Sequence, residues 1–179
     1  SKLFVDEIVH QSSQGSGTIT LGASGETISL GSGVTSKVNE PYFQVERDAE
    51  QSISDATVTK IQWDTVTFDT GSYFNATDYS YKPLVAGKYF VYAQTYPDAQ
   101  GNSDLDDCFM YLYKNGSEIF QCGTNFGDND IRNTTLNLSF IVDMNGTSDY
   151  LDVRLFLDDN SGSGRIQATK NTFSAFRMG

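Results

Sequence analysis

The sequence is poor in the residues that most enzymes and nucleic-acid-binding proteins depend on. It contains a single histidine, His10, so a Ser-His-Asp or Cys-His arrangement would have to be built around that residue. Lys and Arg number 12 against 23 Asp and Glu, which gives a net charge of −11, and no basic cluster with interleaved aromatics is present to follow a phosphate backbone. We therefore expect neither catalysis nor nucleic-acid binding, and we assign no catalytic residue.

Cysteine is also scarce, and the two that occur, Cys108 and Cys122, are too few for a disulfide framework. They flank a predicted hairpin whose turn is Asn115-Gly116, a strong two-residue turn signal. Counting outward from that turn, Cys108 faces Gly123, so the two thiols project from opposite faces and a disulfide is disfavoured. A three-residue loop would reverse this result, and the sequence leaves the redox state of the pair open.

Long apolar runs are absent as well, so we expect no membrane insertion. No charged-then-apolar segment typical of a signal peptide opens the sequence, and we expect release from a cell within an assembled particle. The apolar fraction of 38%, with 12 Phe and 10 Tyr, argues against global disorder. A length of 179 residues suits one domain, or one domain with an appendage, and allows a sizeable core.

The chain divides by composition at about residue 40. Residues 1–40 have almost no aromatics after Phe4, and in them Thr-Ile-Thr-Leu-Gly at 18–22 returns as Thr-Ile-Ser-Leu-Gly at 27–31, a repeat of nine residues. Each copy is typical of one short strand and one turn, with an apolar face. A flexible Gly/Ser linker does not require a β-branched residue at the same position of each repeat, so the repeat favours an ordered element over a linker.

The energetics of the repeat indicate that several chains share it. Burying its apolar side chains is worth on the order of 6–12 kcal/mol, whereas fixing some fifteen backbone units costs on the order of 15–30 kcal/mol. Because one chain alone cannot hold the segment in one shape, we expect copies of the chain to wind together as an oligomeric stalk. The predicted stalk and trimer core consists of Ile19, Leu21, Ile28 and Leu30.

From Pro41 onward the pattern is that of an all-β domain. Runs rich in Val, Ile, Thr, Tyr and Phe are broken by Gly, Asn and Asp turns, and nothing predicts a helix of three turns. We expect residues 41–179 to form a jelly roll, a β-sandwich of roughly eight to ten strands. The predicted strand-bearing runs are YFQVE (42–46), TVTKIQWDTVTF (57–68), YSYKPLVAGKYFVYAQTY (79–96), CFMYLYKNGSEIFQC (108–122), TTLNLSFIVDM (134–144), DYLDVRLFL (149–157) and TFSAFRM (172–178).

Acidic side chains gather in the predicted loops. Carboxylates of one loop can bind Ca²⁺ through six to eight oxygens, although the spacing here does not follow the helix–loop–helix calcium pattern. The alternative is that these carboxylates are exposed to solvent and bind no cation. Apart from such a cation, no cofactor is expected. Loops 98–107 and 124–133 are also candidates for contact with a host surface. The cation candidates are Asp98, Asp104, Asp106 and Asp107, and the host-contact candidates are Asp98, Asp104, Asp106, Asp107, Asp128 and Asp130.

Aromatic clustering gives a second hint of binding. The stretch SYFNATDYSYKP brings Tyr73, Phe74, Tyr79 and Tyr81 close together in the sequence. Tyrosine rings can stack on sugar faces while the hydroxyl forms hydrogen bonds. The alternative is that these rings belong to the sandwich core or to an interface between copies, and Trp63 is expected to be packed.

Several of these runs, in this order, resemble the head domain of the C1q and tumour-necrosis-factor superfamily. VTFDTGSYF at 66–74 resembles the family's strand leading into an aromatic turn, YSYKPLVAGKYFVYA at 79–93 its Pro- and Gly-containing aromatic segment, and LYKNG at 112–116 its hairpin. The late strands within 136–157 and the closing FSAFRM at 173–178 also match in place. The resemblance implies a ten-strand jelly roll that associates as a homotrimer.

The opening of the chain has a different resemblance. Residues 4–30, FVDEIVHQSSQGSGTITLGASGETISL, are similar to the N-terminal segments of virion structural proteins of tailed phages, particularly phages of marine bacteria such as cyanophages. This segment has no collagen repeat. The resemblance implies a non-enzymatic, trimeric capsid-decoration or fibre protein located in the virion, with residues 1–40 bound to other virion proteins. The alternative is a receptor-binding tail-fibre tip that recognises a host surface glycan or protein; a secreted signalling ligand is a third interpretation.

Overall fold

The computed structural model describes residues 40–100, 104–160, 162 and 164–178. The predictions made for the repeat, with Ile19, Leu21, Ile28 and Leu30, lie outside the described residues and stay predictions. The described residues contain strands and turns and no helix, which confirms the all-β prediction. Within these ranges no helix has the length and hydropathy needed to cross a bilayer.

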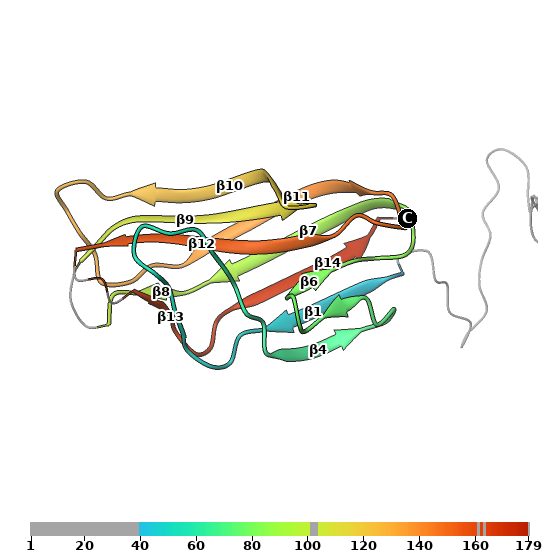
Figure 1. The fold of residues 1–179 in the computed structure, drawn as a ribbon, viewed down its shortest axis with the longest axis horizontal. Helices are drawn as coiled ribbons and strands as arrows, with labels where there is room; N and C mark the ends of the chain where they lie inside the picture. The colour runs from blue at the N-terminus through green and yellow to red at the C-terminus, as the bar shows by residue number, and fades with distance from the viewer. Residues whose placement is uncertain (1–39, 101–103, 161, 163, 179) are drawn as a thin grey trace, which may run out of the picture. The chain divides into compact units, whose positions relative to one another are not determined.

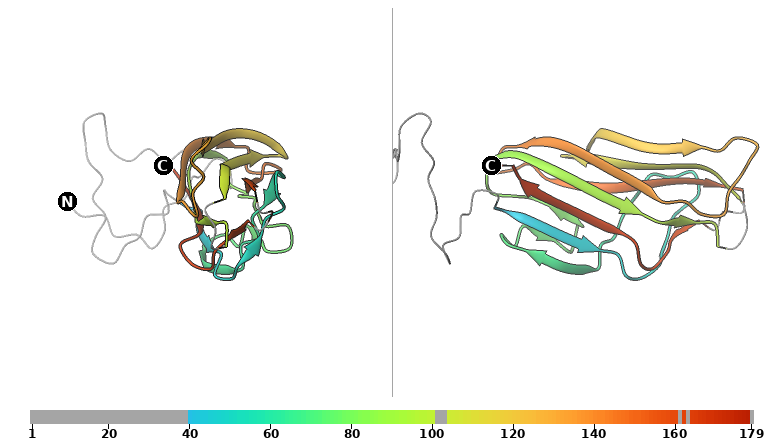
Figure 2. Two further views of the ribbon diagram at one scale, coloured as in Figure 1. Left: turned by 90° about the vertical axis from the view of Figure 1, so that its left-hand side faces the viewer. Right: turned by 180° about the vertical axis from the view of Figure 1, so that it is seen from behind.

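The first layer of the sandwich is a five-stranded antiparallel sheet (Figure 2, right). Its long strands follow the predicted runs because Val, Ile, Tyr and Phe alternate with polar residues along them, so one side of each strand can face a core. In order across the sheet the strands are β11 (Leu136–Met144), β7 (Gly87–Thr95), β14 (Thr172–Arg177), β1 (Tyr42–Glu46) and β4 (Thr65–Asp69).

The second layer is a six-stranded sheet, and a small third sheet lies at one end of the sandwich (Figure 1). All the strand pairs in these sheets are antiparallel, as in a jelly roll. The second layer consists of β10 (Ser117–Asn125), β9 (Leu105–Lys114), β12 (Leu151–Asp159), β6 (Ser80–Tyr81) and β5 (Phe74–Asn75), with β3 (Thr59–Lys60) beside β12; the third sheet consists of β2 (Gln51–Ser52), β13 (Arg165–Ile166) and β8 (Pro97–Asp98).

Aromatic rings from both layers form the centre of the core. The ring of Phe43 on β1 stacks on Tyr81 of β6 with centroids 3.8 Å apart, and it meets the edge of Phe173 on β14 at 4.9 Å. Trp63 packs against Phe173 at 5.8 Å and is buried, as predicted. Because these rings join the two layers, side chains that point the other way from the first sheet face outward.

The hairpin between β9 and β10 has the predicted two-residue turn. Lys114 pairs with Ser117 across the turn, and Asn115 and Gly116 have positive φ angles of 54° and 79°. These are the conformations of a type I′ turn, which Asn and Gly adopt more easily than other residues.

Beyond the turn the strand register differs from the prediction. A bulge between Glu118 and Phe120 shifts the pairing by one residue, so Cys108 lies opposite Thr124. A shift of one residue turns the following side chains to the other face of the strand. Cys108 and Cys122 therefore share the core-facing side as diagonal neighbours, and the prediction of opposite faces is wrong. Both are free thiols, because diagonal pairs lie roughly 7–8 Å apart, too far for a disulfide.

The turn between β11 and β12 depends on a glycine. Gly146 has a φ of 69°, and a Cβ at this position would collide with the backbone nitrogen of Ala86. The preceding Asn145 fixes the turn, since its Oδ1 accepts hydrogen bonds from the N–H groups of Thr147 and Ser148, at 2.9 Å each. Close backbone approach and positive φ together require glycine here.

Replacing Gly146 by alanine should destabilise the fold more than the same change at Gly162. Both residues have positive φ, but a Cβ at Gly162 would meet no atom within 4 Å. Both substitutions cause backbone strain, and only Gly146→Ala adds a collision with backbone atoms, for a further cost of about 2 kcal/mol. Urea unfolding of both variants measures the difference; equal losses would show that the contact with Ala86 is not restrictive.

Candidate functional site

The outer face of the five-stranded sheet carries a continuous row of apolar side chains. Across the strands, Ile141 pairs with Phe90, Phe90 with Phe176, and Phe176 with Tyr42. Phe68 completes the row on the edge strand, with its ring centroid 5.5 Å from that of Tyr42. We call these five residues the apolar row; it crosses all the strands of the sheet.

Most of the apolar row is open to solvent in the single chain. Ile141 is 51% exposed, Phe176 44%, Phe68 41% and Tyr42 40%. Isolated apolar residues are common on protein surfaces, but a contiguous patch marks a surface that contacts another molecule. Covering a side chain of this size is worth roughly 1.5–3 kcal/mol, so the row is a candidate interaction surface.

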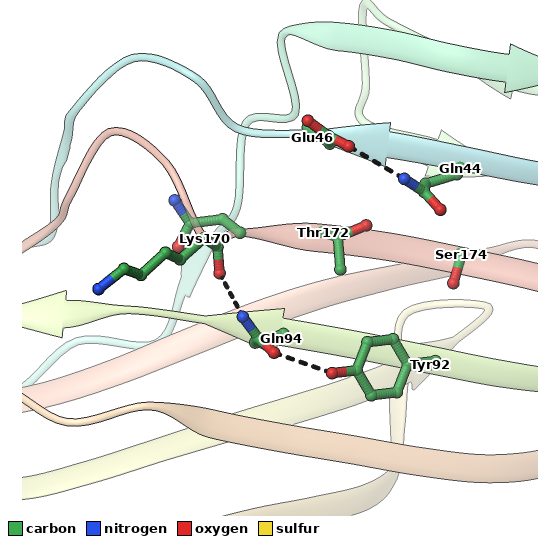
Figure 3. A pocket seen from close by; sticks show the side chains of 8 residues that line it. Gln44, Glu46, Tyr92, Gln94, Lys170, Thr172 and Ser174 are labelled. Atoms are coloured by element: carbon green, nitrogen blue, oxygen red, sulfur yellow. Dashed lines mark hydrogen bonds between the residues drawn. The ribbon is translucent and has the colours of Figure 1, made fainter.

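Next to the apolar row the same face becomes polar and forms a shallow hollow of about 260 Å³ (Figure 3). Its side chains form short hydrogen bonds along the sheet: Gln44 Nε2 donates to Glu46 Oε1 at 2.9 Å, and Gln94 Nε2 donates to the Lys170 carbonyl at 2.8 Å. The Tyr92 hydroxyl lies 2.9 Å from Gln94 Oε1. We call this the polar hollow; its lining residues are Gln44, Glu46, Tyr92, Gln94, Lys170, Asn171, Thr172 and Ser174.

The rim of the polar hollow is held in an unusual backbone conformation. Thr169 and Lys170 have φ angles of 78° and 63°, and positive φ is an outlier for a β-branched residue. The buried side chain of Asn171 holds this loop: its Nδ2 donates to the carbonyls of Gln167 and Thr169 at 2.6 and 2.8 Å, and its Oδ1 accepts from the Tyr96 N–H at 2.8 Å. These hydrogen bonds hold the strained backbone at Lys170 in place.

The structure corrects the prediction that Asp98 stands in a solvated loop. Asp98 belongs to β8, is fully buried, and forms ion pairs with Arg165 at 2.9 Å and Arg132 at 3.4 Å. Burial alone would raise the pKa of Asp98, but hydrogen bonds from Gln167 and Arg165 and the charge of Arg165 outweigh it and lower the pKa. Asp98 therefore ties the small third sheet together and has no surface for a host molecule.

The other predicted acidic residues lie at the start of β9 and in the turn after β10, which are at the same end of the sandwich (Figure 1), and their settings differ. Asp128 is exposed in the turn after β10, and the Asp130 carboxylate accepts a hydrogen bond from Asn160 Nδ2 at 2.7 Å. Asp107 lies directly opposite Asp158 on β12. In the described part of the chain, no group of three or more His, Cys, Asp or Glu residues is arranged to hold a metal ion. The cation candidates Asp104, Asp106 and Asp107 therefore gain no ligand set there.

The aromatic cluster of the sequence belongs to the core. Tyr81 is fully buried and stacks on Phe43, and Phe74 stacks on the same ring from 6.2 Å. Tyr73 and Tyr79 are half-buried and pack against the core. Of the two alternatives left open for these rings, packing is the one that the structure supports.

The apolar row and the polar hollow were missed by sequence reasoning. The row could have been found from strands that have aromatic residues on both faces. In YFQVE, Tyr42 points outward and Phe43 inward. In FSAFRM, Phe173 points inward and Phe176 outward. A strand with bulky apolar residues on both faces is typical of a sheet covered on both sides.

Comparison with solved structures identifies the fold. The chain is similar to the Eiger tumour necrosis factor of S. frugiperda, with a TM-score of 0.59 and 13% identity over 77% of this chain and 92% of that one. It is also similar to murine APRIL, with a TM-score of 0.55 and 11% identity over 77% and 100%, and to the globular domain of zebrafish complement 1qA, with a TM-score of 0.54 and 9% identity over 78% and 98%. The expected jelly roll of the C1q and tumour-necrosis-factor type is confirmed.

No family model matches the sequence, and no curated protein matches it either. At identities of 9–13% the structural likeness establishes the fold alone. The function therefore has to be argued from the surface of this chain.

Asp158 should oppose folding when it is ionised. Burial, followed by the charges of Asp55, Asp106, Asp107 and Asp159, raises the pKa of Asp158 above its ordinary value. When the pKa of a carboxyl group is raised in the folded state, the folded protein becomes less stable as the pH rises from the unfolded pKa, about 3.9, through the folded pKa. Thermal melting from pH 3 to pH 8 measures this effect. The melting temperature of Asp158→Asn should be higher than that of the parent protein at neutral pH and equal to it below about pH 3.9.

The matched control for this prediction is Asp128→Asn, which removes the same charge from an exposed turn. It should leave the melting temperature nearly unchanged over the same pH range. If Asp158→Asn were no more stable than Asp128→Asn at neutral pH, repulsion among the carboxylates at this end would be negligible.

Proposed function

We propose that this protein is a non-enzymatic structural protein of a phage virion. In this proposal three copies associate through the outer faces of their five-stranded sheets, residues 41–179 form an outward-facing knob, and residues 1–40 attach the trimer to the capsid or to a fibre. The single structural observation behind the proposed self-association is the apolar row. Its exposed aromatics call for a covering molecule, and a second copy of the chain is present wherever the first one is.

The sheet face has the composition of a protein–protein interface. Its centre is aromatic and aliphatic, and its margin is polar, with amides and hydroxyls that can form hydrogen bonds between subunits. Association around a threefold axis would let one part of the face on each copy meet another part on the next copy, so that a closed ring forms. The resemblance of 41–179 to C1q and tumour-necrosis-factor heads supports the number three.

The position of the chain ends supports an outward-facing knob. The start of β1 lies at the same end of the sandwich as the C-terminal end of β14, because Tyr42 pairs with Phe176 (Figure 1). The connections that follow β10 and β12 lie at the opposite end. We therefore propose that those connections form the outward-facing end of the knob. The resemblance of residues 4–30 to phage virion proteins supports the particle as the attachment site.

The same geometry supports the alternative function, a receptor-binding tip of a tail fibre. Asp128 is exposed in the turn after β10, at the end opposite the start of β1, where a host glycan or protein could reach it. Competition between the isolated protein and whole phage for host cells separates the two functions. Blocked adsorption supports the receptor-binding tip, and unchanged adsorption supports decoration.

Substituting Phe176 by serine should weaken self-association with little effect on the fold of each copy. Phe176 is 44% exposed in the single chain and lies at the centre of the apolar row, where truncation of a buried aromatic weakens an interface by about tenfold or more. Leu84→Ser is the control, because Leu84 is 55% exposed but lies outside the sheet strands. Sedimentation equilibrium should give a trimer for the parent protein and the control and dissociation for Phe176→Ser. A parent protein that is monomeric at micromolar concentration would refute the trimer.

A chain that begins at Pro41 should fold but fail to join particles. The two sheets and their core are formed by residues after Glu40, so circular dichroism should show the same β-sheet spectrum and cooperative melting as the full chain. Mixing each chain with virions that lack the protein, followed by sedimentation of the particles, measures attachment. Equal attachment of both chains would contradict the role assigned to residues 1–40.

A further inference from the structure

The polar hollow contains one carboxylate and one ammonium group, and they are not paired with each other. Glu46 accepts hydrogen bonds at Oε1 from Gln44 Nε2 at 2.9 Å and from the Thr67 hydroxyl at 3.2 Å. The Lys170 ammonium lies over the ring of Tyr96, 4.5 Å from its centroid. Figure 3 shows the Lys170 side chain extending away from Glu46. Among the described residues, neither forms an ion pair.

These two groups differ from the other charges on this face of the sheet. Lys88 and Asp143, beyond the apolar row, already form an ion pair within the chain at 2.8 Å, and both side chains are more than half exposed. They need no partner from another molecule. Glu46 and Lys170 line a hollow that shares Gln44 and Ser174 with the pocket over Tyr42, Phe68 and Phe176, so a molecule that extends from the apolar row across the hollow removes water from them.

Covering the sheet face without pairing these charges would be unfavourable. A buried charge is tolerated when an opposite charge or several hydrogen bonds replace its water. The chain itself supplies Lys170 with a ring face and Glu46 with neutral donors. A second copy of the chain offers the missing partners, since it presents an ammonium and a carboxylate on the same surface.

We propose that in the assembled protein Lys170 of one copy forms an ion pair with Glu46 of the neighbouring copy. This inference rests on the proposed self-association through the sheet face and names the residues that give it direction. In a closed ring all the interfaces are equivalent, so the same pair recurs at every interface.

The Glu46 carboxylate and the Lys170 backbone are positioned in advance for such a contact. The Lys170 backbone is fixed by the left-handed loop that Asn171 holds and by the bond from Gln94, and the Glu46 carboxylate is fixed by Gln44 and Thr67. Groups held in place lose less entropy on association than free side chains do.

The pair would determine which way the copies meet. Burial of the apolar row favours contact but depends little on direction, because the hydrophobic effect is proportional to area. Opposite charges at fixed positions favour one register and disfavour those in which like charges meet. The apolar row then supplies affinity, and Glu46 with Lys170 supplies specificity.

Charge reversal tests the pair in the full chain. Glu46→Lys and Lys170→Glu each place like charges together, and each should weaken self-association by at least about tenfold at low salt, with a smaller loss at high salt. The double variant Glu46→Lys with Lys170→Glu restores opposite charges and should associate within about threefold of the parent protein. The control is Glu118→Lys, which makes the same charge change on the exposed side of β10 in the other sheet and should have no effect.

Sedimentation equilibrium of these variants separates the possible failures. If the parent protein is monomeric, the proposed self-association itself fails. If the parent protein is trimeric but the single reversals associate normally, or if the double variant is as weak as the single ones, the ion pair is refuted and the trimer stands. Melting curves check folding, and Glu46→Gln, which keeps an acceptor for Gln44 and Thr67 but no charge, provides a second, milder variant that should also weaken association.

Discussion

A β-sheet has two faces, and the core of a sandwich uses only one face of each sheet. In this protein the inward face of the five-stranded sheet carries Phe43 and Phe173, and its outward face carries the apolar row. Water makes that second face unfavourable at roughly 25 cal/mol for each Å² left exposed. The fold of the single chain buries only the first face. The proposed trimer and the direction in which its copies meet therefore depend on covering the second.

The strands were predictable because their causes are local. Alternation of apolar and polar residues gave YFQVE, which is β1 at Tyr42–Glu46, and the pair Asn115-Gly116 gave the β9–β10 turn. The bulge between Glu118 and Phe120 was not predictable in this way. It changes the register by one residue without any turn signal, and only packing against the opposite sheet decides which register buries the apolar side chains.

The candidate site could be predicted only in small part, since it is built from register across strands far apart in the sequence. Phe90, Phe176 and Tyr42 become neighbours because β7, β14 and β1 lie side by side. Asp98 was misplaced for the same reason: its partner Arg165 is 67 positions away in the chain, and the sequence alone showed an acidic residue in a polar stretch. The composition of the sequence indicated where the acidic residues gather, but only the structure showed what each of them contacts.

The proposed trimer requires that the apolar row is covered when copies of the chain assemble. Hydroxyl-radical footprinting measures this directly, because it reports the solvent exposure of individual aromatic side chains. Samples at concentrations above and below dissociation are compared, with Phe109 on the outward face of the other sheet as the internal reference. Oxidation of Tyr42 and Phe176 should fall on assembly while that of Phe109 stays constant. Equal oxidation of Tyr42 and Phe176 in both samples would contradict it.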